Sequence, residues 1–191
     1  MAVHELNETV SDEVLAGLIA GGDERSFAML MDRYQAKLMR YGRKFLPNVD
    51  EIEDVVQDVF IKTYQNIKGF DPARSFAPWI YRIAHNVFVN ALRDRARDPL
   101  LFVDYDALML HPDPHDGESA REREEVRTLV EQGIEKLSPT YREVIILYYL
   151  EELGYQEIAD VLHVPVGTVG VRLQRARGAL RKHIVGAGDI K

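Results

Sequence analysis

Hydrophobic residues recur every three to four positions along most of this chain, which is the spacing of one buried face of an α-helix. Ser11 and Asp23 are each followed by acidic residues, the pattern of an N-cap with negative charge in the first turn. Asp50 with Glu53 three residues later forms a capping-box pattern at the start of another helix. Alternating runs typical of strands are scarce, so the pattern predicts an all-α fold.

The helical pattern is interrupted in the middle of the chain. A long amphipathic stretch covers 76–97, where Pro78 is acceptable because it falls near the first turn. From 98 to about 120 the periodicity is lost, and Pro, Gly and acidic residues cluster in HPDPHDGES. Helical pattern resumes near Arg121, and Ser138 followed by Pro139 resembles an N-cap with Pro at the first helical position. The next helices are expected at about 139–150, 155–162 and 166–183.

Charge is distributed unevenly along the chain, whose net charge is −7. Residues 98–135 contain 3 Lys or Arg and 11 Asp or Glu, whereas residues 1–97 and 136–191 have net charges of −1 and +2. The acidity therefore belongs to the middle segment, and the flanking parts remain open to a nucleic-acid partner. The sequence predicts two small helical domains joined by a flexible acidic linker, with boundaries at 1–97, 98–124 and 125–191.

The composition is that of a globular protein, with 46% hydrophobic and 29% charged residues. The chain contains no cysteine, which excludes disulfides, thiolate zinc sites and cysteine nucleophiles. No run approaches the roughly 18–20 apolar residues that a membrane span needs. The N-terminal MAVHELNETV lacks the basic start and apolar core of a secretion signal. We therefore expect a cytoplasmic protein without membrane insertion.

The segment from 155 to 183 has the pattern of a helix-turn-helix. YQEIADVL is a short amphipathic helix containing the small residue Ala159, His163 lies in the expected turn, and helical spacing resumes with VGTVGVRLQRARGAL. At 100° per residue, the second helix gathers an expected buried face of Val166, Val169, Leu173, Ala176 and Leu180. Its opposite face contains Thr168, Val171, Gln174, Arg175 and Gly178, with Arg172 and Arg177 at the flanks of the buried face.

From 164 to 177, the charged residues of this second helix are all basic, because this stretch contains no Asp or Glu. In a helix-turn-helix the second helix enters the major groove of DNA. Arg175 is therefore placed for base edges or phosphate, and Arg172 and Arg177 for the backbone on either side. The alternative is a solvated amphipathic helix whose arginines contact only water. The preceding helix and turn favour DNA binding.

The helix expected from residue 50 has the opposite charge. Its inward positions are hydrophobic, namely Ile52, Val55, Val56, Val59 and Phe60. Its surface is acidic and polar, with Asp54, Gln57 and Asp58 and no basic residue from 50 to 60. Such a face cannot favour phosphate and indicates a protein partner, although an ordinary solvated helix face has the same pattern.

The stretch GFDPARSFAPWIYRIAHNVFVNALRDRAR combines a loop with a long helix. One arc of this helix is expected to be core: Trp79, Ile80, Ile83, Ala84, Val87 and Ala91. Another arc presents Arg82, His85, Asn86, Val89 and Arg93, with Asn90 at its edge. Arginines on that arc would meet phosphates, amides would read exposed base edges, and Phe70 or Tyr81 would stack on an unpaired base. The alternative for these aromatic rings is an ordinary place in the core.

Three segments together resemble the extracytoplasmic-function (ECF) sigma factors of bacteria, which belong to the sigma-70 family. LSPTYREVIILYYLEELGYQEIADVLHVPVGTVGVRLQRARGALRK resembles their C-terminal domain, which implies binding to the promoter −35 element. DVVQDVF is similar to the segment that docks on RNA polymerase, which implies docking through Asp54, Gln57 and Asp58. FAPWIYRIAHN is similar to the domain that recognises and melts the −10 element. It implies DNA contacts at Asn86 and Asn90 and capture of a flipped base by the loop at about 66–75.

The resemblance covers about residues 11–97 and 125–183 in the expected order. It implies binding to the clamp helices and flap of core RNA polymerase, binding to promoter DNA, and restraint by an anti-sigma factor. No cofactor and no enzymatic activity are expected. Gly170 and Val171 depart from the basic residue and the Ser that are common in the family, and Gly154 replaces the usual Ser or Thr cap. The departures at Gly170 and Val171 predict the loss of one or two backbone or base contacts to −35 DNA. The departure at Gly154 predicts only a mild loss of capping, because Gly is itself tolerated there.

Other functions fit parts of the chain. His111, Asp113 and His115 have metal-ligating side chains, but they lie among prolines outside any predicted helix, which favours a flexible linker. A stand-alone helix-turn-helix regulator would usually be dimeric and bind duplex DNA tightly by itself. It accounts for 164–177 but leaves the acidic helix beside WIYRIAHN unexplained. A protein that only sequesters polymerase would bind core without melting DNA.

Overall fold

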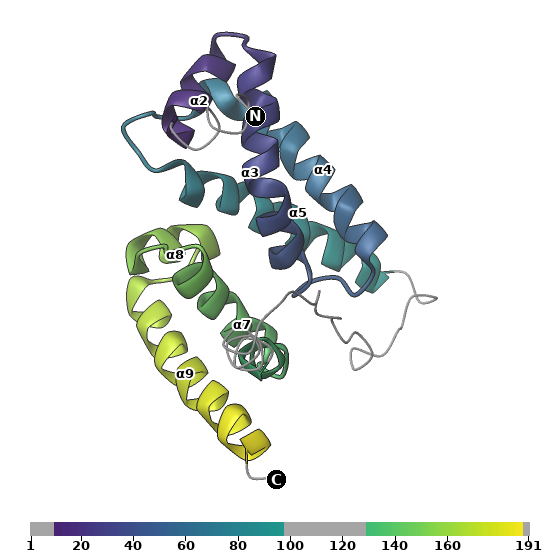
Figure 1. Ribbon diagram of the computed structural model, residues 1–191, viewed down its shortest axis with the longest axis vertical. Coiled ribbons are helices and arrows are strands. Elements are labelled where there is room, and N and C mark those ends of the chain that lie inside the picture. The colour runs from purple at the N-terminus through teal and green to yellow at the C-terminus, as the bar shows by residue number, and fades with distance from the viewer. Residues whose placement is uncertain (1–9, 98–128, 189–191) are drawn as a thin grey trace, which may run out of the picture. The chain divides into compact units, whose positions relative to one another are not determined.

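The computed structural model describes residues 10–97 and 129–188, which are helical apart from the turns between helices. The chain divides into two compact units, the first containing α2 to α5 and the second containing α7, α9 and most of α8 (Figure 1). No strand occurs in the two described ranges, so the prediction of two all-α units is confirmed. The acidic linker and the predicted resumption of helix near Arg121 lie outside the described residues.

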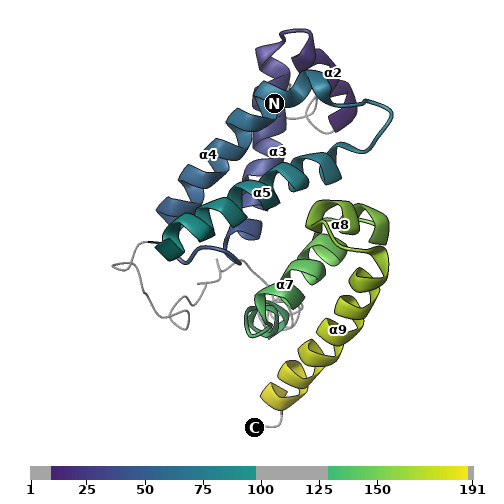
Figure 2. The same cartoon turned by 180° about the vertical axis from the view of Figure 1, so that it is seen from behind.

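The first unit is a bundle of long helices with a shorter helix at one end. Its elements are α2 (Asp12–Ala20), α3 (Glu24–Gly42), α4 (Val49–Asn66), the short 3₁₀ turn η1 (Ile67–Gly69) and α5 (Phe76–Arg97). α4 packs against both α3 and α5, and α2 lies against α3, η1 and α5 (Figures 1 and 2). The loop between η1 and α5 therefore starts and ends next to α2.

The helix starts follow local capping. Oγ of Ser11 accepts a hydrogen bond from the Val14 N–H at 3.4 Å, and Oδ1 of Asp23 accepts one from the Arg25 N–H at 3.1 Å, so both predicted N-caps are confirmed. The predicted capping box of Asp50 and Glu53 is wrong. Asn48 is the N-cap of α4, and its Oδ1 accepts the Asp50 N–H at 2.9 Å. Asp50 thus lies inside the first turn of α4, where the helix dipole still stabilises its negative charge.

Aromatic rings fill the core of the first unit. The fully buried rings are Tyr34 and Tyr41 from α3 and Phe76, Tyr81 and Phe88 from α5. Ile80, Ala84 and Val87 are buried as predicted, whereas Trp79, Ile83 and Ala91 are only half-buried, which corrects the predicted core arc. The large rings bury more area than the aliphatic residues do, so the side of α5 that carries its own large rings is the side that faces the core.

The described part of the second unit begins with helical residues at 129–135. It continues with α7 (Pro139–Ile145), the π-helical turn η3 (Ile146–Leu150), α8 (Tyr155–Leu162) and α9 (Val166–Gly188). The predicted helix at 139–150 therefore has the expected extent, but its last five residues are wound more widely. The Glu151 N–H donates to the carbonyl oxygen of Ile146 at 3.1 Å, five residues back. Such single π turns are rare and are often found at functional sites.

Arg142 joins α7 to the preceding helical turn. Its guanidinium donates to the carbonyl oxygens of Ile134 at 3.1 Å and Leu137 at 3.3 Å, and also to that of Glu135. These carbonyls lie at the end of the helical residues 129–135, where the last turn has no partners within the helix. Burial lowers the pKa of Arg142, although the nearby Glu135 carboxylate opposes this shift.

The helix-turn-helix has the predicted geometry. His163 has a φ of 53°, a left-handed turn conformation between α8 and α9, and Ala159 is buried at 4% exposure. Val169, Leu173 and Ala176 of α9 are fully buried as predicted. Val166 is 45% exposed, which corrects its predicted place in the core, because it is the first residue of α9 and lies between exposed neighbours. Within the described ranges, no helix has the length and apolar character needed to cross a membrane.

Candidate nucleic-acid and polymerase interfaces

The exposed side of α5 carries four of the residues that the sequence assigns to promoter DNA. Arg82, Asn86, Asn90 and Arg93 are all exposed and follow one another at helical spacing. Nη1 of Arg93 donates a hydrogen bond to Oδ1 of Asn90 at 3.4 Å, which aligns the last two side chains. The four side chains therefore form one polar and basic stripe along α5.

The two aromatic residues predicted to stack on an unpaired base are both in the core. Tyr81 has no exposed surface, and its ring centroid lies 5.2 Å from that of Tyr41. Phe70 is 8% exposed, and its ring packs 5.3 Å from the rings of Phe76 and Trp79. The prediction of base stacking by Phe70 and Tyr81 is wrong for this structure, because packing inside the bundle covers the ring faces that a base would need.

Trp79 is half-buried and lines a pocket of about 290 Å³ that opens to solvent. The lining residues come from α4 and α5 and are Lys62, Asn66, Trp79, Arg82, Ile83, Asn86 and Val87. Two cationic side chains and two amides thus border an indole ring. This set of groups suits the phosphates, base edges and base faces of single-stranded nucleic acid.

Lys62 and Asn66 are pocket residues that sequence analysis missed. They lie one turn apart at the C-terminal end of α4, and Nδ2 of Asn66 donates to the carbonyl oxygen of Lys62 at 2.7 Å. Their i, i+4 spacing marks a shared helix face. However, only the packing of α4 against α5 brings that face to Trp79 and Arg82.

The residues predicted to bind a protein partner share a face of α4. Asp54, Gln57 and Asp58 are exposed, and Ile61 and Tyr64 are exposed further along the helix, at 53% and 44%. Sequence analysis missed these two hydrophobic residues, although their helical spacing from Asp54 and Gln57 was an available signal. The face therefore combines polar and acidic groups with apolar side chains, as protein–protein interfaces commonly do.

Charge on α4 is partly compensated by α5. Glu51, one turn before Asp54, forms an ion pair with Arg95 of α5. This contact also links the N-terminal part of α4 to the C-terminal part of α5. The acidic character of the α4 face is accordingly centred on Asp54 and Asp58.

On α9, most residues predicted to face DNA are on the exposed side. Val171, Gln174 and Arg175 are exposed, and Thr168 and Arg172 are half-buried. The preceding helix, α8, has a cap of its own, since the Gly154 N–H at its beginning donates to Oε2 of Glu157 at 2.7 Å. This bond is half of a capping box, so α8 keeps a cap without the usual Ser or Thr.

Arg177, the other predicted backbone contact, is held against aromatic rings. Its guanidinium carbon lies 5.5 Å from the ring centroids of both Tyr148 and Tyr149, within the range of a cation–π interaction. Partial burial alone would lower the pKa of Arg177, but interactions with Tyr149 and Tyr155 outweigh it, and the pKa is raised. The cation is therefore held on α9, the second helix of the helix-turn-helix, against the two tyrosine rings.

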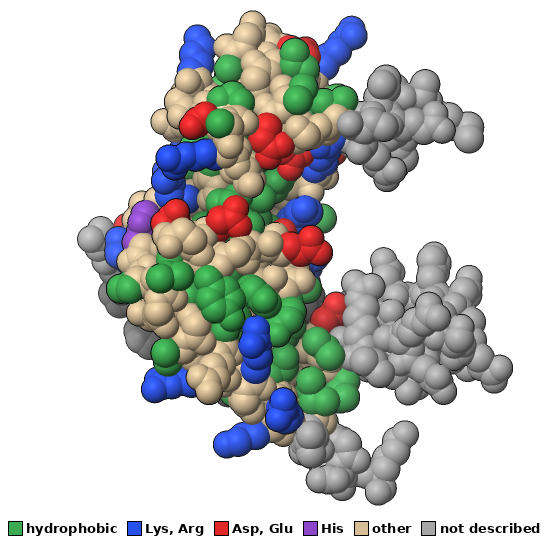
Figure 3. Space-filling view, turned by 90° about the vertical axis from the view of Figure 1, so that its left-hand side faces the viewer, with side chains coloured by type: hydrophobic (Ala, Val, Ile, Leu, Met, Phe, Trp, Pro, Cys, Tyr) green, Lys and Arg blue, Asp and Glu red, His purple; other side chains and the backbone are tan. Residues whose placement is uncertain are grey.

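The second unit also exposes hydrophobic side chains. In the lower half of Figure 3, such side chains gather on the face turned to the viewer, with Lys and Arg side chains among them. The large hydrophobic residues exposed in the described part of this unit are Tyr149, Leu150, Tyr155, Val166 and Val171. Exposed apolar surface next to a basic helix is typical of an interaction site.

The predicted metal-ligating cluster, His111, Asp113 and His115, lies outside the described residues. Within 10–97 and 129–188, no group of three or more His, Cys, Asp or Glu side chains could hold a metal ion.

Comparison with protein families gives two matches, one for each unit. The family model of sigma-70 region 2 matches residues 30–98, and that of sigma-70, region 4 matches residues 127–180. The first match covers most of α3 and all of α4 and α5, and the second covers the helix-turn-helix.

Individual relatives match over most of the chain. The ECF RNA polymerase sigma factor SigW of Bacillus subtilis is 38% identical over 170 residues, which are 85% of this chain and 91% of SigW. The ECF RNA polymerase sigma-E factor of Escherichia coli K12 is 36% identical over 183 residues, or 92% of this chain and 95% of that protein. The solved structure of CnrH in complex with the cytosolic domain of CnrY has a TM-score of 0.64 at 28% identity, covering 92% of this chain and 97% of CnrH.

Proposed function

This chain belongs to the ECF sigma factors of the sigma-70 family, the promoter-recognising subunits of RNA polymerase, and we propose that it contacts promoter DNA through a separate face on each unit. It acts by binding and not by catalysis, and it works in the cytoplasm with the polymerase. In this proposal, residues 1–97 form the domain that docks on polymerase and recognises the −10 element. Residues 125–191 form the domain that recognises the −35 element, and residues 98–124 are the acidic linker between them.

The observation that carries the −10 assignment is the Trp79 pocket. Lys62 and Arg82 supply positive charge for phosphates, and Asn66 and Asn86 supply amides for the edges of unpaired bases. The half-buried indole of Trp79 offers the stacking surface that Phe70 and Tyr81 do not. We propose that a strand of the melted promoter enters this pocket and continues along Asn90 and Arg93.

The α4 face is the proposed docking site for the clamp helices of core polymerase. Asp54, Gln57 and Asp58 provide a polar and acidic patch that favours a basic protein surface over DNA. Ile61 and Tyr64 add exposed apolar area beside it, where a partner helix can exclude water. The flap of the polymerase is proposed to bind the apolar surface of the second unit around Tyr149 and Leu150.

The α9 face is the proposed −35 contact. Thr168, Val171, Gln174 and Arg175 point away from the buried side of α9 and would enter the major groove, with Arg172 on the adjoining backbone. Arg177 would reach phosphate from its place over the rings of Tyr148 and Tyr149. A further proposed partner is an anti-sigma factor, since the related protein CnrH was solved in complex with a cytosolic protein domain.

The test is reconstitution with bacterial core polymerase and a supercoiled promoter library. We expect a stable complex and specific start sites. The double variant Arg82→Ala/Asn86→Ala should assemble normally but form open complexes about tenfold more slowly, because contacts to single-stranded DNA are lost. Asp54→Ala/Asp58→Ala should weaken assembly itself.

Arg25→Ala is the matched control, because Arg25 is an exposed arginine on α3 and is not among the residues assigned to either face. It should leave assembly and initiation unchanged. A complex without initiation would indicate a protein that sequesters polymerase. Absence of a complex, together with tight duplex binding by the chain alone, would favour the stand-alone regulator.

A further inference from the structure

The loop that precedes α5 is anchored at both ends. At its start, the ring of Phe70 packs 5.3 Å from the rings of Phe76 and Trp79. At its end, Phe76 is fully buried as the first residue of α5. Residues 71–75 between these anchors are all exposed, and Oδ1 of Asp71 accepts the Ala73 N–H at 3.0 Å, which forms a tight turn at the tip.

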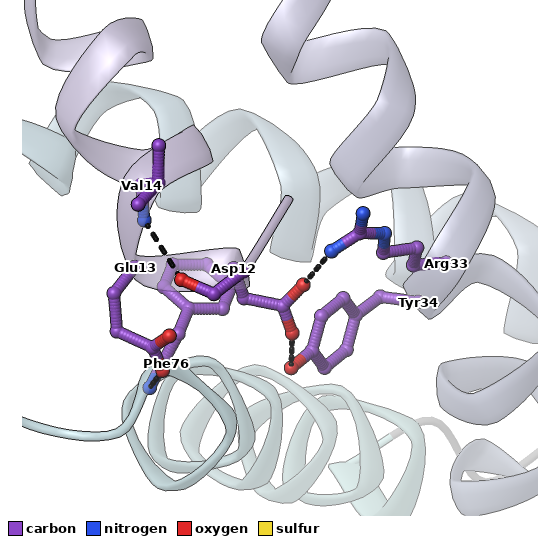
Figure 4. Close-up of polar contacts among 7 residues, drawn as sticks. Asp12, Glu13, Val14, Arg33, Tyr34 and Phe76 are labelled. Atoms are coloured by element: carbon purple, nitrogen blue, oxygen red, sulfur yellow. Dashed lines mark hydrogen bonds and ion pairs between the residues drawn. The ribbon is translucent and has the colours of Figure 1, made fainter. Parts of the chain in front are cut away.

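The second anchor depends on a residue from another helix. Oε1 of Glu13, on α2, accepts a hydrogen bond from the Phe76 N–H at 3.0 Å, although the two residues are 63 positions apart (Figure 4). The first N–H groups of a helix have no partner within the helix, and a carboxylate there is also favoured by the helix dipole. Glu13 therefore caps α5 from outside.

Glu13 is held in its charged form. Partial burial is the largest single influence and works against ionisation. The hydrogen bonds from the Phe76 N–H, from its own N–H and from the Ser11 hydroxyl together outweigh burial, and the pKa of Glu13 is lowered. The cap is accordingly a charged one at neutral pH.

We infer that Glu13 is a positioning residue for −10 recognition, fixing the exposed loop 71–75 and the first turn of α5 so that Trp79 borders its pocket. The inference rests on the proposed function of that pocket. Trp79 lies one turn after Phe76, and their rings are 5.5 Å apart, so a displaced helix start would move the indole. Glu13 itself touches backbone and not DNA.

The neighbouring residue provides a matched control. Asp12 is on the same helix but points to α3, where its Oδ2 accepts the Tyr34 hydroxyl at 2.6 Å and its Oδ1 pairs with Arg33 at 2.5 Å (Figure 4). Replacing Asp12 by Asn loosens α2 from the bundle without removing the cap on α5. The two substitutions thus separate general stability from loop position.

The experiment compares Glu13→Ala, Glu13→Gln and Asp12→Asn in the full-length chain. The first readout is the fluorescence of Trp79, which reports on the loop and helix start because it is the only tryptophan of the chain. The second readout is the affinity of the reconstituted holoenzyme for single-stranded non-template DNA from a promoter that the wild-type holoenzyme selects. Thermal melting of each variant is measured alongside.

We expect Glu13→Ala to shift the Trp79 emission to longer wavelength, and to increase its quenching by acrylamide. It should weaken single-strand binding about fivefold, the population change that loss of an N-cap typically produces. Glu13→Gln should restore most of the affinity, because its amide oxygen still accepts the Phe76 N–H. Asp12→Asn should lower the melting temperature but leave emission and affinity unchanged.

The inference is overturned if Glu13→Ala leaves Trp79 emission and affinity at wild-type values, or if Asp12→Asn changes both to the same extent as Glu13→Ala. Failure of the proposed function looks different, because the wild-type holoenzyme itself would then not bind the single strand. Trp79 fluorescence still tests the anchor in that case, since it needs no DNA.

Discussion

Gly170 occupies a position on α9 where a larger side chain has room. A Cβ built at this residue would lie 3.7 Å from Cε2 of Tyr155, an ordinary van der Waals contact. The resemblance of this segment to the C-terminal domain of ECF sigma factors implies a basic residue here. The absence of that side chain leaves the helix-turn-helix with fewer cations for DNA than the fold can carry.

We predict that Gly170→Arg strengthens binding of the holoenzyme to duplex −35 DNA. The added cation should raise the affinity roughly tenfold at low salt and increase the slope of log K against log salt by about 0.9, the value for one further phosphate contact. Fluorescence anisotropy over a salt series measures both quantities.

The control for this substitution is Gly17→Arg on α2, where a Cβ has nothing within 4 Å. Both changes remove a helix-interior glycine and add one positive charge. The free energy of unfolding should therefore rise by a similar amount in the two variants, about 1 kcal/mol. Equal DNA affinities for the two variants would contradict the prediction.

At the scale of elements, the contact of α3 with α4 and α5 depends on Gly42. A Cβ at this position would lie 2.6 Å from Cγ2 of Ile52 and 2.6 Å from Cζ of Phe88, and both side chains are fully buried. Neither neighbour can move into open space, because interiors are close-packed. A glycine near the end of α3 is therefore a packing requirement of the bundle.

We predict that Gly42→Ala destabilises the first unit by about 1–3 kcal/mol through overpacking. Its melting temperature should fall by at least ~4 °C, measured by circular dichroism. Gly17→Ala is the matched control, because that glycine is exposed and its replacement should stabilise α2. A Gly42→Ala variant as stable as wild type would show that the helices can separate without cost.

At the scale of the whole molecule, the proposed function divides the DNA contacts between two units, with few phosphate contacts on each. The proposed cationic contacts are Lys62, Arg82 and Arg93 on one unit and Arg172, Arg175 and Arg177 on the other. A small number of such contacts gives weak, salt-sensitive binding. Attachment of both units to polymerase makes the second contact intramolecular and raises the combined affinity.

We predict that the free chain binds promoter duplex at least about 100-fold more weakly than the holoenzyme does at equal salt. Anisotropy titrations with and without core polymerase measure the ratio. Comparable affinities, with a dimeric chain by light scattering, would instead support a stand-alone regulator.

Sequence patterns were sufficient for much of the architecture. Helical periodicity predicted the two all-α units, and Ser11, Asp23 and Ser138 marked helix starts that the structure contains. These features are local, since a cap or an amphipathic face is set by residues within one or two turns. The choice of Asn48 over Asp50 as N-cap of α4 shows the limit, because adjacent capping residues compete and sequence alone does not rank them.

In the candidate site, too, some features follow from local sequence and others only from the packing of helices. The exposed residues of α4, α5 and α9 follow from helical spacing, and the family of the chain follows from its motifs. The burial of Phe70 and Tyr81, the partial exposure of Trp79 and the approach of Lys62 and Asn66 to it do not follow from helical spacing. Each depends on which helix faces meet in the bundle, where the large aromatic rings of α3 and α5 bury the most area.

The sequence by itself thus determined the helices, their polar faces and the family. Only the tertiary structure decided that Glu13 caps α5 across 63 positions and that Arg177 rests on two tyrosines. The physical reason is that these contacts join groups far apart along the chain. Their formation depends on how whole helices pack, and no local pattern encodes that packing.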